Sequence, residues 1–343
     1  MTRVEITELL GDGIGPELRQ AVHSVAEVLP LEFDFIPVDF TLENREKSDR
    51  GLYEDAAAQM AATRLALKYP TVTKTLSPNA IIRRLCDFTV ILRPVISIPG
   101  ISSNFKQNVF LYIVRIATGG TYDDPGRLIG RDAAISIRIV EREPCRQAAK
   151  FAFRLAQSKG LTVTSSSKHT IQKVTDGLFE SIVGKVHEQF ADVGHHVELF
   201  DALLAKIILK PQDFQVILVL NEYGDFLSDM ASGLVGGLGT GASGSFSFDE
   251  ADEVQIAMFD PAGGTAPDIA GQNRCNPTAM LFAFGMLLDH VGRYDVGHAL
   301  RLSILESIAA RECTADLGGG LSMTEFTEHV KARLPDHLPQ SAA

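Results

Sequence analysis

The sequence of 343 residues has only four cysteines, no tryptophan and no long apolar run. The cysteines, at positions 86, 145, 275 and 313, form no CxxC pair, so neither a zinc site nor a redox disulfide is indicated. They are typical of reduced core residues in a cytosolic protein. Charges or glycines interrupt the apolar stretches, which argues against a transmembrane span, and the N-terminus lacks a signal-peptide pattern. We therefore expect a cytoplasmic protein with no membrane partner.

Positive charge is also scarce. The chain has 32 Lys and Arg against 43 Asp and Glu, for a net charge of −11. This balance argues against a nucleic-acid partner. An anionic substrate must therefore be captured by a local group of basic side chains, because the overall field repels it.

Strand-like and helical segments alternate along the chain, which predicts an α/β architecture with a largely covered sheet. Strands are expected at residues 4–10, 32–40, 88–94, 109–115, 133–140, 161–165 and 216–220. Helices are expected from Pro16 and over 55–67, 141–158 and 174–190, and the segment 197–209 carries Asp201. Residues 96–107 are rich in Pro, Gly, Ser and Asn and are expected to cross between two lobes.

Residues 221–229 place two carboxylates, Asp225 and Asp229, four residues apart. If Asp225 opens a helix, both project from one face, one turn apart. Hard oxygen donors at that spacing suit Mg²⁺ or Mn²⁺. The alternative is a helix N-terminus whose acids complement the helix dipole.

Arg93 and Arg115 each come at the end of an apolar strand. A buried, unpaired guanidinium costs much free energy, so each should face a cleft or a carboxylate. Together with Arg83, Ser77 and Asn79 they form a set suited to a polycarboxylate, because the planar guanidinium matches carboxylate geometry. Ordinary structural salt bridges are the alternative.

Lys168 follows the predicted strand 161–165. Close to a metal and several cations its pKa would fall, which would suit it to proton transfer. An ordinary surface lysine is the alternative. We group Tyr122 with the three arginines as a further candidate site residue.

Two glycine-rich segments suggest nucleotide binding, and they differ in strength. Residues 239–244 satisfy GxGxxG, but no helix follows, so we reject a Rossmann site there. In the loop 259–271, glycines would let backbone amides approach a nucleotide. Asp268 would accept hydrogen bonds from an adenosine ribose and would repel a 2′-phosphate. A solvent-exposed turn is the alternative.

Taken together, these motifs resemble the β-decarboxylating dehydrogenases of the isocitrate/isopropylmalate dehydrogenase family, which has homoisocitrate and tartrate/malate relatives. The resemblance runs from about residue 4 to 326. It includes LGDGIGPE at 10–17, LRPV at 92–95, TGGTY at 118–122, Lys168, Asp201, residues 221–229, GTAPDIAG at 264–271, NPT at 276–278 and DLGG at 316–319.

The resemblance implies the family's fold, in which two lobes share a mixed sheet that is not of Rossmann type. The large nucleotide-binding domain would comprise 1–98 and 250–343. The small domain, 99–249, would carry the dimer interface and the metal-binding acids. A shared active site implies an obligate homodimer.

The resemblance also implies residue roles. The metal ligands would be Asp225, Asp229 and Asp201 of the partner subunit. The proton-transfer pair would be Tyr122 and Lys168 of the partner subunit. Substrate would contact Ser77, Asn79, Arg83, Arg93 and Arg115. The cofactor would contact Gly264, Thr265, Ala266, Asp268, Ile269, Asn276 and Thr170. The pair Asp268-Ile269 is similar to that of NAD-using members, so the expected cofactors are NAD and Mg²⁺ or Mn²⁺.

Two motifs bear on the identity of the substrate, and they resemble different branches of the family. The spacing Ser-x-Asn-x-x-x-Arg at 77–83 resembles the isocitrate branch, where it holds a third carboxylate, whereas 115–122 resembles the isopropylmalate branch. Gly263 and Thr170 replace residues usual in the family. We expect NAD-dependent oxidative decarboxylation of a 2-hydroxy tricarboxylate, isocitrate or a close analogue. Homoisocitrate, isopropylmalate, tartrate, a phosphonate analogue resembling phosphonomethylmalate, and a non-catalytic regulatory paralogue stay open.

Overall fold

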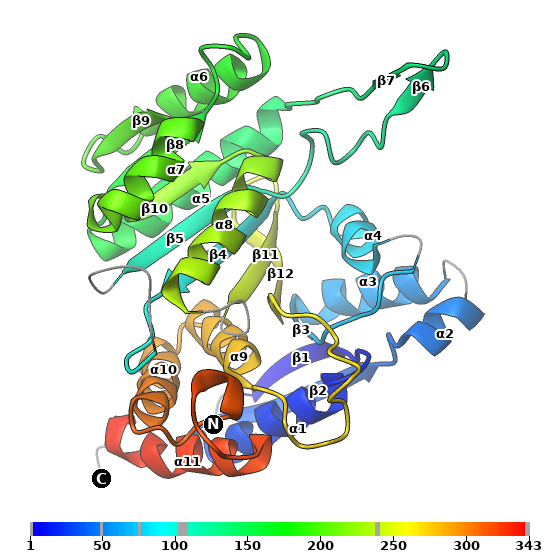
Figure 1. Ribbon diagram of the computed structural model, residues 1–343, viewed down its shortest axis with the longest axis vertical. Coiled ribbons are helices and arrows are strands. Elements are labelled where there is room, and N and C mark those ends of the chain that lie inside the picture. The colour runs from blue at the N-terminus through cyan, green and yellow to red at the C-terminus, as the bar shows by residue number, and fades with distance from the viewer. Residues whose placement is uncertain (1–2, 49–50, 75–76, 102–108, 237–240, 340–343) are drawn as a thin grey trace.

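The computed structural model describes residues 3–48, 51–74, 77–101, 109–236 and 241–339. One ten-stranded mixed sheet runs through the molecule in the order β2-β1-β3-β12-β11-β4-β5-β10-β8-β9 (Figure 1). Its strands are β1 (Arg3–Leu9), β2 (Glu32–Val38), β3 (Leu65–Lys68), β4 (Val90–Ile96), β5 (Phe110–Ile116), β8 (Val163–Ser167), β9 (His195–Leu199), β10 (Val216–Val219), β11 (Ala242–Phe248) and β12 (Val254–Pro261). The predicted α/β class is confirmed.

Helices cover both faces of this sheet (Figure 1). They are α1 (Gly15–Ala26), α2 (Leu42–Lys47), α3 (Gly51–Thr63), α4 (Pro78–Leu85), α5 (Arg142–Lys159), α6 (Thr175–His187), α7 (Phe200–Leu209), α8 (Asn221–Val235), α9 (Thr278–His290), α10 (Tyr294–Ala309) and α11 (Met323–His337). The largest buried cluster joins α1, α5, α6, α9, α10 and α11 to one face. Two smaller clusters join α7 and α8, and α3 and α4, to the other face. Side chains alternate between faces along each strand, so both faces are buried.

The parallel strands at the centre determine where the site lies. β10 runs parallel to both β5 and β8, with Val219 opposite Arg115 on one side and Ser166 on the other. The carboxyl ends of these strands therefore meet at one edge of the sheet. Loops and helices that start there present their first side chains to a common region, which is where open α/β sheets bind ligands.

Two predicted elements differ from the structure. The expected helix over 55–67 ends at Thr63, because Arg64 adopts a left-handed backbone (φ 59°) and 65–68 form the buried strand β3. The expected strand over 133–140 is reduced to β7 (Ala133–Ile135). It pairs with β6 (Arg127–Ile129) as a two-stranded arm that projects from the molecule (Figure 1), so its alternating pattern does not face a core.

The remaining fold predictions concern the GxGxxG segment, the crossing between lobes, membrane spans and the domain boundaries. Within the described part of the rejected GxGxxG segment, the chain leads into the strand β11 and not into a helix, while 239–240 lie outside the described residues. Residues 102–108 of the predicted crossing also lie outside them. No helix in the described ranges has the length and apolar character that a membrane crossing requires. The two domain boundaries stay a prediction.

Candidate active site

Basic side chains from three elements meet in a small polar cavity of about 110 Å³. Arg83 comes from α4, Arg93 from β4 and Lys68 from the end of β3, and Asn79 and Asp260 complete the charged and amide lining. Arg93 lies in the middle of its strand, not at the end as predicted, opposite Ile113 of β5.

Three buried polar atoms of this cavity have no hydrogen-bond partner among the described residues: Asn79 Oδ1, Arg83 Nε and Arg93 Nε. Buried polar groups in proteins are nearly always paired, and leaving one unpaired costs about 1–3 kcal/mol. A ligand with several oxygen acceptors would satisfy the two guanidinium donors. Ser77 caps the helix that carries Asn79 and Arg83, with its hydroxyl accepting from the Ala80 amide at 3.4 Å.

The sequence prediction missed two members of this cavity, Lys68 and Asp260. Burial lowers the pKa of Lys68 to about 8, while Asp260 opposes the shift. Burial also raises the pKa of Asp260, and Lys68 and Arg83 act against that change. A lysine closing the apolar stretch Leu65–Lys68 was the available signal, because a strand buried along its whole length rarely ends in a charge without a function.

Arg115 has the carboxylate partner that the sequence predicted. Its side chain, 3% exposed, forms an ion pair with Asp225. Its Nε and Nη2 donate to Asn221 Oδ1 at 3.0 and 2.8 Å. A side chain at Gly224 would place Cβ 2.6 Å from the Arg115 Cβ, so glycine permits this close approach. Burial lowers the pKa of Arg115 to about 10, and Asp225 limits the decrease.

The two acids of α8 share one face of the helix, as predicted, although α8 begins at Asn221 and not at Asp225. Arg93 Nη1 lies 3.1 Å from Asp229 Oδ1 and 3.6 Å from Asp225 Oδ1. The Tyr122 hydroxyl donates to Asp225 Oδ2 at 3.0 Å. Burial, and then the Asp225 charge, raise the pKa of Tyr122. We call Arg93, Arg115, Tyr122, Asp225 and Asp229 the cleft cluster.

Lys168 and Asp201 form a separate pair. Lys168 Nζ lies 2.6 Å from Asp201 Oδ1, and this hydrogen bond lowers the pKa of Asp201. The Asp201 side chain is 66% exposed. Across the described part of one chain, no three His, Cys, Asp or Glu side chains gather closely enough to hold a metal ion. The chain therefore has two acids in the cleft cluster and a third acid, Asp201, elsewhere on its surface.

A larger cleft of about 760 Å³ adjoins the polar cavity, and the two share the lining residues Pro70, Pro261, Gly263 and Gly264. Of the predicted cofactor residues, Gly264, Ala266, Ile269 and Asn276 line it. The Asn276 amide donates to Asp316 Oδ2 at 2.9 Å, and Asp316 lines the cleft as well.

The other predicted cofactor residues lie outside this lining. Thr265 instead accepts from the Ile14 amide through its carbonyl at 3.0 Å. Asp268 is exposed next to the lining residue Ile269. Thr170 belongs to the turn that follows Lys168.

A mixed α/β sheet with basic and acidic side chains in a polar cavity beside a larger cleft is compatible with an enzyme that binds an anionic substrate next to a second ligand. A sequence profile described as isocitrate/isopropylmalate dehydrogenase matches residues 5–330, and the chain belongs to that family of β-decarboxylating dehydrogenases.

Three similar proteins illustrate the breadth of the family. A mitochondrial regulatory subunit of the NAD isocitrate dehydrogenase of Dictyostelium discoideum is 30% identical, covering 97% of this chain and 93% of its own. The 3-isopropylmalate/3-methylmalate dehydrogenase of Methanocaldococcus jannaschii is 32% identical, covering 96% and 98%. The crystal structure of isocitrate dehydrogenase from Methylococcus capsulatus superposes with a TM-score of 0.85 at 30% identity, covering 96% and 99%.

Proposed function

We propose that the protein catalyses NAD-dependent oxidative decarboxylation of a 2-hydroxy tricarboxylate, isocitrate or a close analogue. The polar cavity carries this proposal. Its lining includes Lys68, Arg83 and Arg93, and two guanidinium nitrogens lack partners in the part of the chain that the structure describes. A third carboxylate would supply the missing acceptors, whereas an isopropyl group would leave these charged groups desolvated and unpaired.

The residues fit a divalent cation. Asp225, Asp229 and Asp201 of the partner subunit would hold Mg²⁺ or Mn²⁺ through carboxylate oxygens, the donors that these ions prefer. The fit to NAD rests on the larger cleft, whose volume of about 760 Å³ lies within the usual range for ligand pockets. Asp268 would disfavour a 2′-phosphate, which supports NAD over NADP.

When bound, NAD⁺ supplies the hydride acceptor, and the cation supplies positive charge at the 2-hydroxyl and its neighbouring carboxylate. Arg83, Arg93 and Arg115 would grip the substrate carboxylates. Lys168 of the partner subunit would take the hydroxyl proton as the carbon is oxidised. After CO₂ leaves, Tyr122 would deliver a proton to the carbon that lost it.

Within the cleft cluster, arginines and acids neutralise each other, with Arg115 on Asp225 and Arg93 on Asp229. A substrate carboxylate that takes over Arg115 would free Asp225 for the cation. This exchange keeps the buried Arg115 paired at each stage, which avoids the cost of an isolated buried charge.

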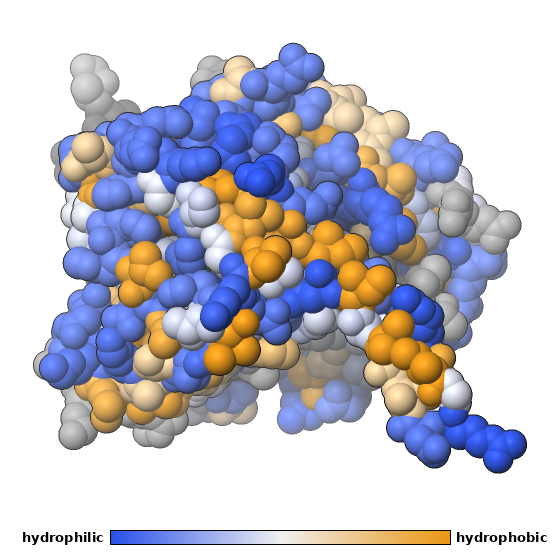
Figure 2. All heavy atoms as spheres, turned by 90° about the horizontal axis from the view of Figure 1, so that it is seen from above, coloured by the Kyte–Doolittle hydropathy of each residue, from blue (hydrophilic) through white to orange (hydrophobic). Residues whose placement is uncertain are grey.

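We also propose that the protein works as a homodimer with a shared site, because Asp201 and Lys168 do not join the acids of their own chain. The face seen in Figure 2 gathers apolar side chains that continue onto the projecting arm. Large apolar side chains exposed on the arm and beside it are Leu128, Ile129, Ile135, Ile137 and Ile139. A second copy packing on them would cover surface that water otherwise contacts.

An assay of NADH formation tests the reaction. Racemic isocitrate, homoisocitrate, isopropylmalate, tartrate and a phosphonate analogue are compared with Mn²⁺ and either NAD⁺ or NADP⁺. We expect isocitrate with NAD⁺ to give the highest kcat/KM. Faster turnover of another acid would reassign the substrate, and no turnover of any of them between about pH 6 and 9 would refute catalysis.

A second candidate is a non-catalytic regulatory paralogue. The replacements at Gly263 and Thr170 favour it, as does the similarity to a relative whose name describes a regulatory role. Calorimetric titration with NAD⁺, Mg²⁺ and isocitrate separates the two. Isocitrate binding without turnover in the assay above would support the regulatory role.

A further inference from the structure

A buried ionic cluster joins three segments beside the candidate site. Arg138, in the segment after β7, forms ion pairs with Asp176 of α6 and with Glu222 of α8, the latter at 3.0 Å. Its guanidinium also lies 4.9 Å from the ring centroid of Tyr223. The Arg138 side chain is 14% exposed and that of Asp176 is completely buried. We call Arg138, Asp176, Glu222 and Tyr223 the Arg138 cluster.

On one side, the Arg138 cluster holds the loop that carries Lys168. The backbone amide of Lys168 donates to Asp176 Oδ2 at 2.8 Å, and the Tyr223 hydroxyl donates to the same oxygen at 3.1 Å. The Tyr223 ring stacks on Phe200 with centroids 4.4 Å apart, and Phe200 directly precedes Asp201. Lys168 is therefore held by a direct hydrogen bond to this cluster, and Asp201 is held through its neighbour Phe200.

On the other side, the Arg138 cluster supports the cleft. Glu222 lies in the first turn of α8, one turn before Asp225. Its Oε2 lies against Gly120, where a Cβ would come within 1.9 Å of that oxygen. The Gly120 amide also donates to the Ile139 carbonyl at 2.7 Å, next to Arg138 in the chain. The loop leading to Tyr122 thus packs against Glu222 and is hydrogen-bonded to the residue that follows Arg138.

We propose that Arg138 is a positioning residue. It fixes the Lys168–Asp201 pair relative to the cleft cluster of the same chain. The inference rests on the proposed function. In the proposed dimer, Lys168 and Asp201 serve the partner's cleft, while Tyr122 and Asp225 serve their own. One guanidinium then sets the geometry of both active sites.

The charges explain why arginine is needed at this position. A single cation neutralises two buried carboxylates, Asp176 and Glu222, so its removal leaves both uncompensated. The two carboxylates would repel each other and separate, and the Lys168 loop would move with Asp176. A displacement of about 1 Å costs roughly 100-fold in rate when reacting groups must be aligned.

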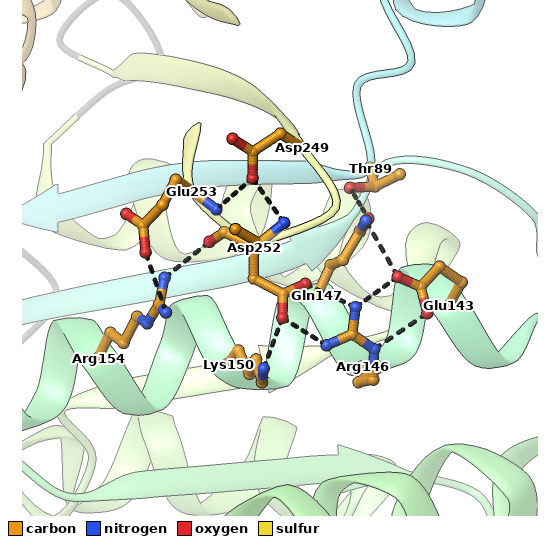
Figure 3. Close-up of polar contacts among 10 residues, drawn as sticks. Thr89, Glu143, Arg146, Gln147, Lys150, Arg154, Asp249, Asp252 and Glu253 are labelled. Atoms are coloured by element: carbon orange, nitrogen blue, oxygen red, sulfur yellow. Dashed lines mark hydrogen bonds and ion pairs between the residues drawn. The ribbon is translucent and has the colours of Figure 1, made fainter. Parts of the chain in front are cut away.

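The test uses Arg138→Met and Arg138→Lys in the full-length protein, with Arg146→Met as the matched control. Arg146 sits in another ion-pair cluster, with Glu143 and Asp252 (Figure 3), and among the described residues no ion pair links this cluster to the proposed reacting residues. Steady-state kinetics with isocitrate, NAD⁺ and Mn²⁺ give kcat and KM. Hydrogen exchange of the ligand-free protein reports on the peptide 167–175.

For Arg138→Met we expect kcat to fall roughly 100-fold, with KM for isocitrate changed less than about threefold, because the Arg138 cluster does not touch Arg83 or Arg93. Arg138→Lys should have a kcat about tenfold higher than that of Arg138→Met, because lysine restores the positive charge. Exchange in 167–175 should accelerate in Arg138→Met. Arg146→Met should leave both kcat and this peptide unchanged.

An unchanged kcat in folded Arg138→Met, an equal loss in Arg146→Met, or no recovery in Arg138→Lys would overturn the inference. If Arg138→Met does not fold, Tyr223→Phe removes one hydrogen bond to Asp176, and kcat should then fall about fivefold, roughly 1 kcal/mol. An unchanged kcat in Tyr223→Phe would also overturn it. If the wild-type protein turns over none of the acids, the proposed function fails, and the exchange rate alone then decides whether Arg138 holds the loop.

Discussion

The arginines of the candidate site and the ion pairs around Asp252 both join basic side chains to carboxylates. They differ in whether every buried polar atom has a hydrogen-bond partner. Around Asp252, Arg146 and Lys150 reach its carboxylate from α5, and Glu143 also pairs with Arg146 (Figure 3). None of the buried side-chain atoms of these residues lacks a partner. At the polar cavity, by contrast, Arg93 Nε and Arg83 Nε have no partner among the described residues.

This difference separates a structural ion-pair group from one prepared for a ligand. A satisfied group gains nothing from an added anion, since its donors are already occupied. Unpaired buried guanidinium nitrogens cost stability in the free protein, and binding of an anion recovers that cost. What marks the site, in the described part of the chain, is that two guanidinium groups lining one cavity have unpaired nitrogens; Arg138 Nη2 is also unpaired but lines neither the polar cavity nor the larger cleft.

Among the tests of this difference, Arg83→Met should have the largest effect. We expect KM for isocitrate to rise roughly 100-fold, about 3 kcal/mol, because one charged donor to the substrate is lost. The free protein should not be destabilised, since Arg83 forms no ion pair with another side chain in the described part of the chain. Steady-state kinetics and thermal unfolding measure both quantities.

The neighbouring residue supplies the control for that experiment. Arg84 lies on the same helix, one position further, and is exposed. Arg84→Met should leave KM within about twofold of the wild type, as is usual for surface substitutions. A similar rise in KM for both variants would show that the cavity is not the substrate site.

The sequence singled out all of the cleft cluster but only part of the cavity that adjoins it. Asp225, Asp229 and Arg115 were selected because acids four apart, and an arginine closing an apolar strand, are local patterns. Lys68 and Asp260 were missed because they lie far apart in the chain and meet only when β3 and β12 pair. Arg138 was also missed, since its segment was predicted as an ordinary strand.

The same limit applies to the fold. Strands such as β10 were predicted because every residue in them is apolar. The end of α3 was not, because the turn at Arg64 depends on β3 entering the sheet between β1 and β12. Tertiary pairing overrode a helical pattern there. The pairing of Lys168 with Asp201 likewise joins a loop to the first turn of α7, which no local pattern connects.

A second test sharpens the comparison through pH. The Lys68 ammonium, with its pKa lowered to about 8 by burial, carries its charge below that pH and loses it above. Anion capture should therefore weaken as pH rises, and KM for isocitrate should increase about tenfold between roughly pH 7 and 9. Lys68→Met should have a high KM at all pH values and no such increase. A KM profile that is the same in both proteins would exclude Lys68 from substrate binding.

The smallest effect concerns the satisfied group. Hydrogen bonds from Arg146, and then from Lys150, lower the pKa of Asp252 to about 2, although burial opposes them. A carboxylate whose folded-state pKa lies below its unfolded value of about 3.9 adds stability at higher pH and loses it as pH falls toward 2. Asp252→Asn should thus lower the Tm by a few degrees at pH 7 and by less at pH 3, with kcat unchanged.

Glu253→Gln is the matched control, because this neighbouring side chain is 68% exposed in its pair with Arg154 and should change the Tm little at either pH. A change in kcat for Asp252→Asn would mean that this ion-pair group also acts on the site, and the contrast between the two groups would not hold.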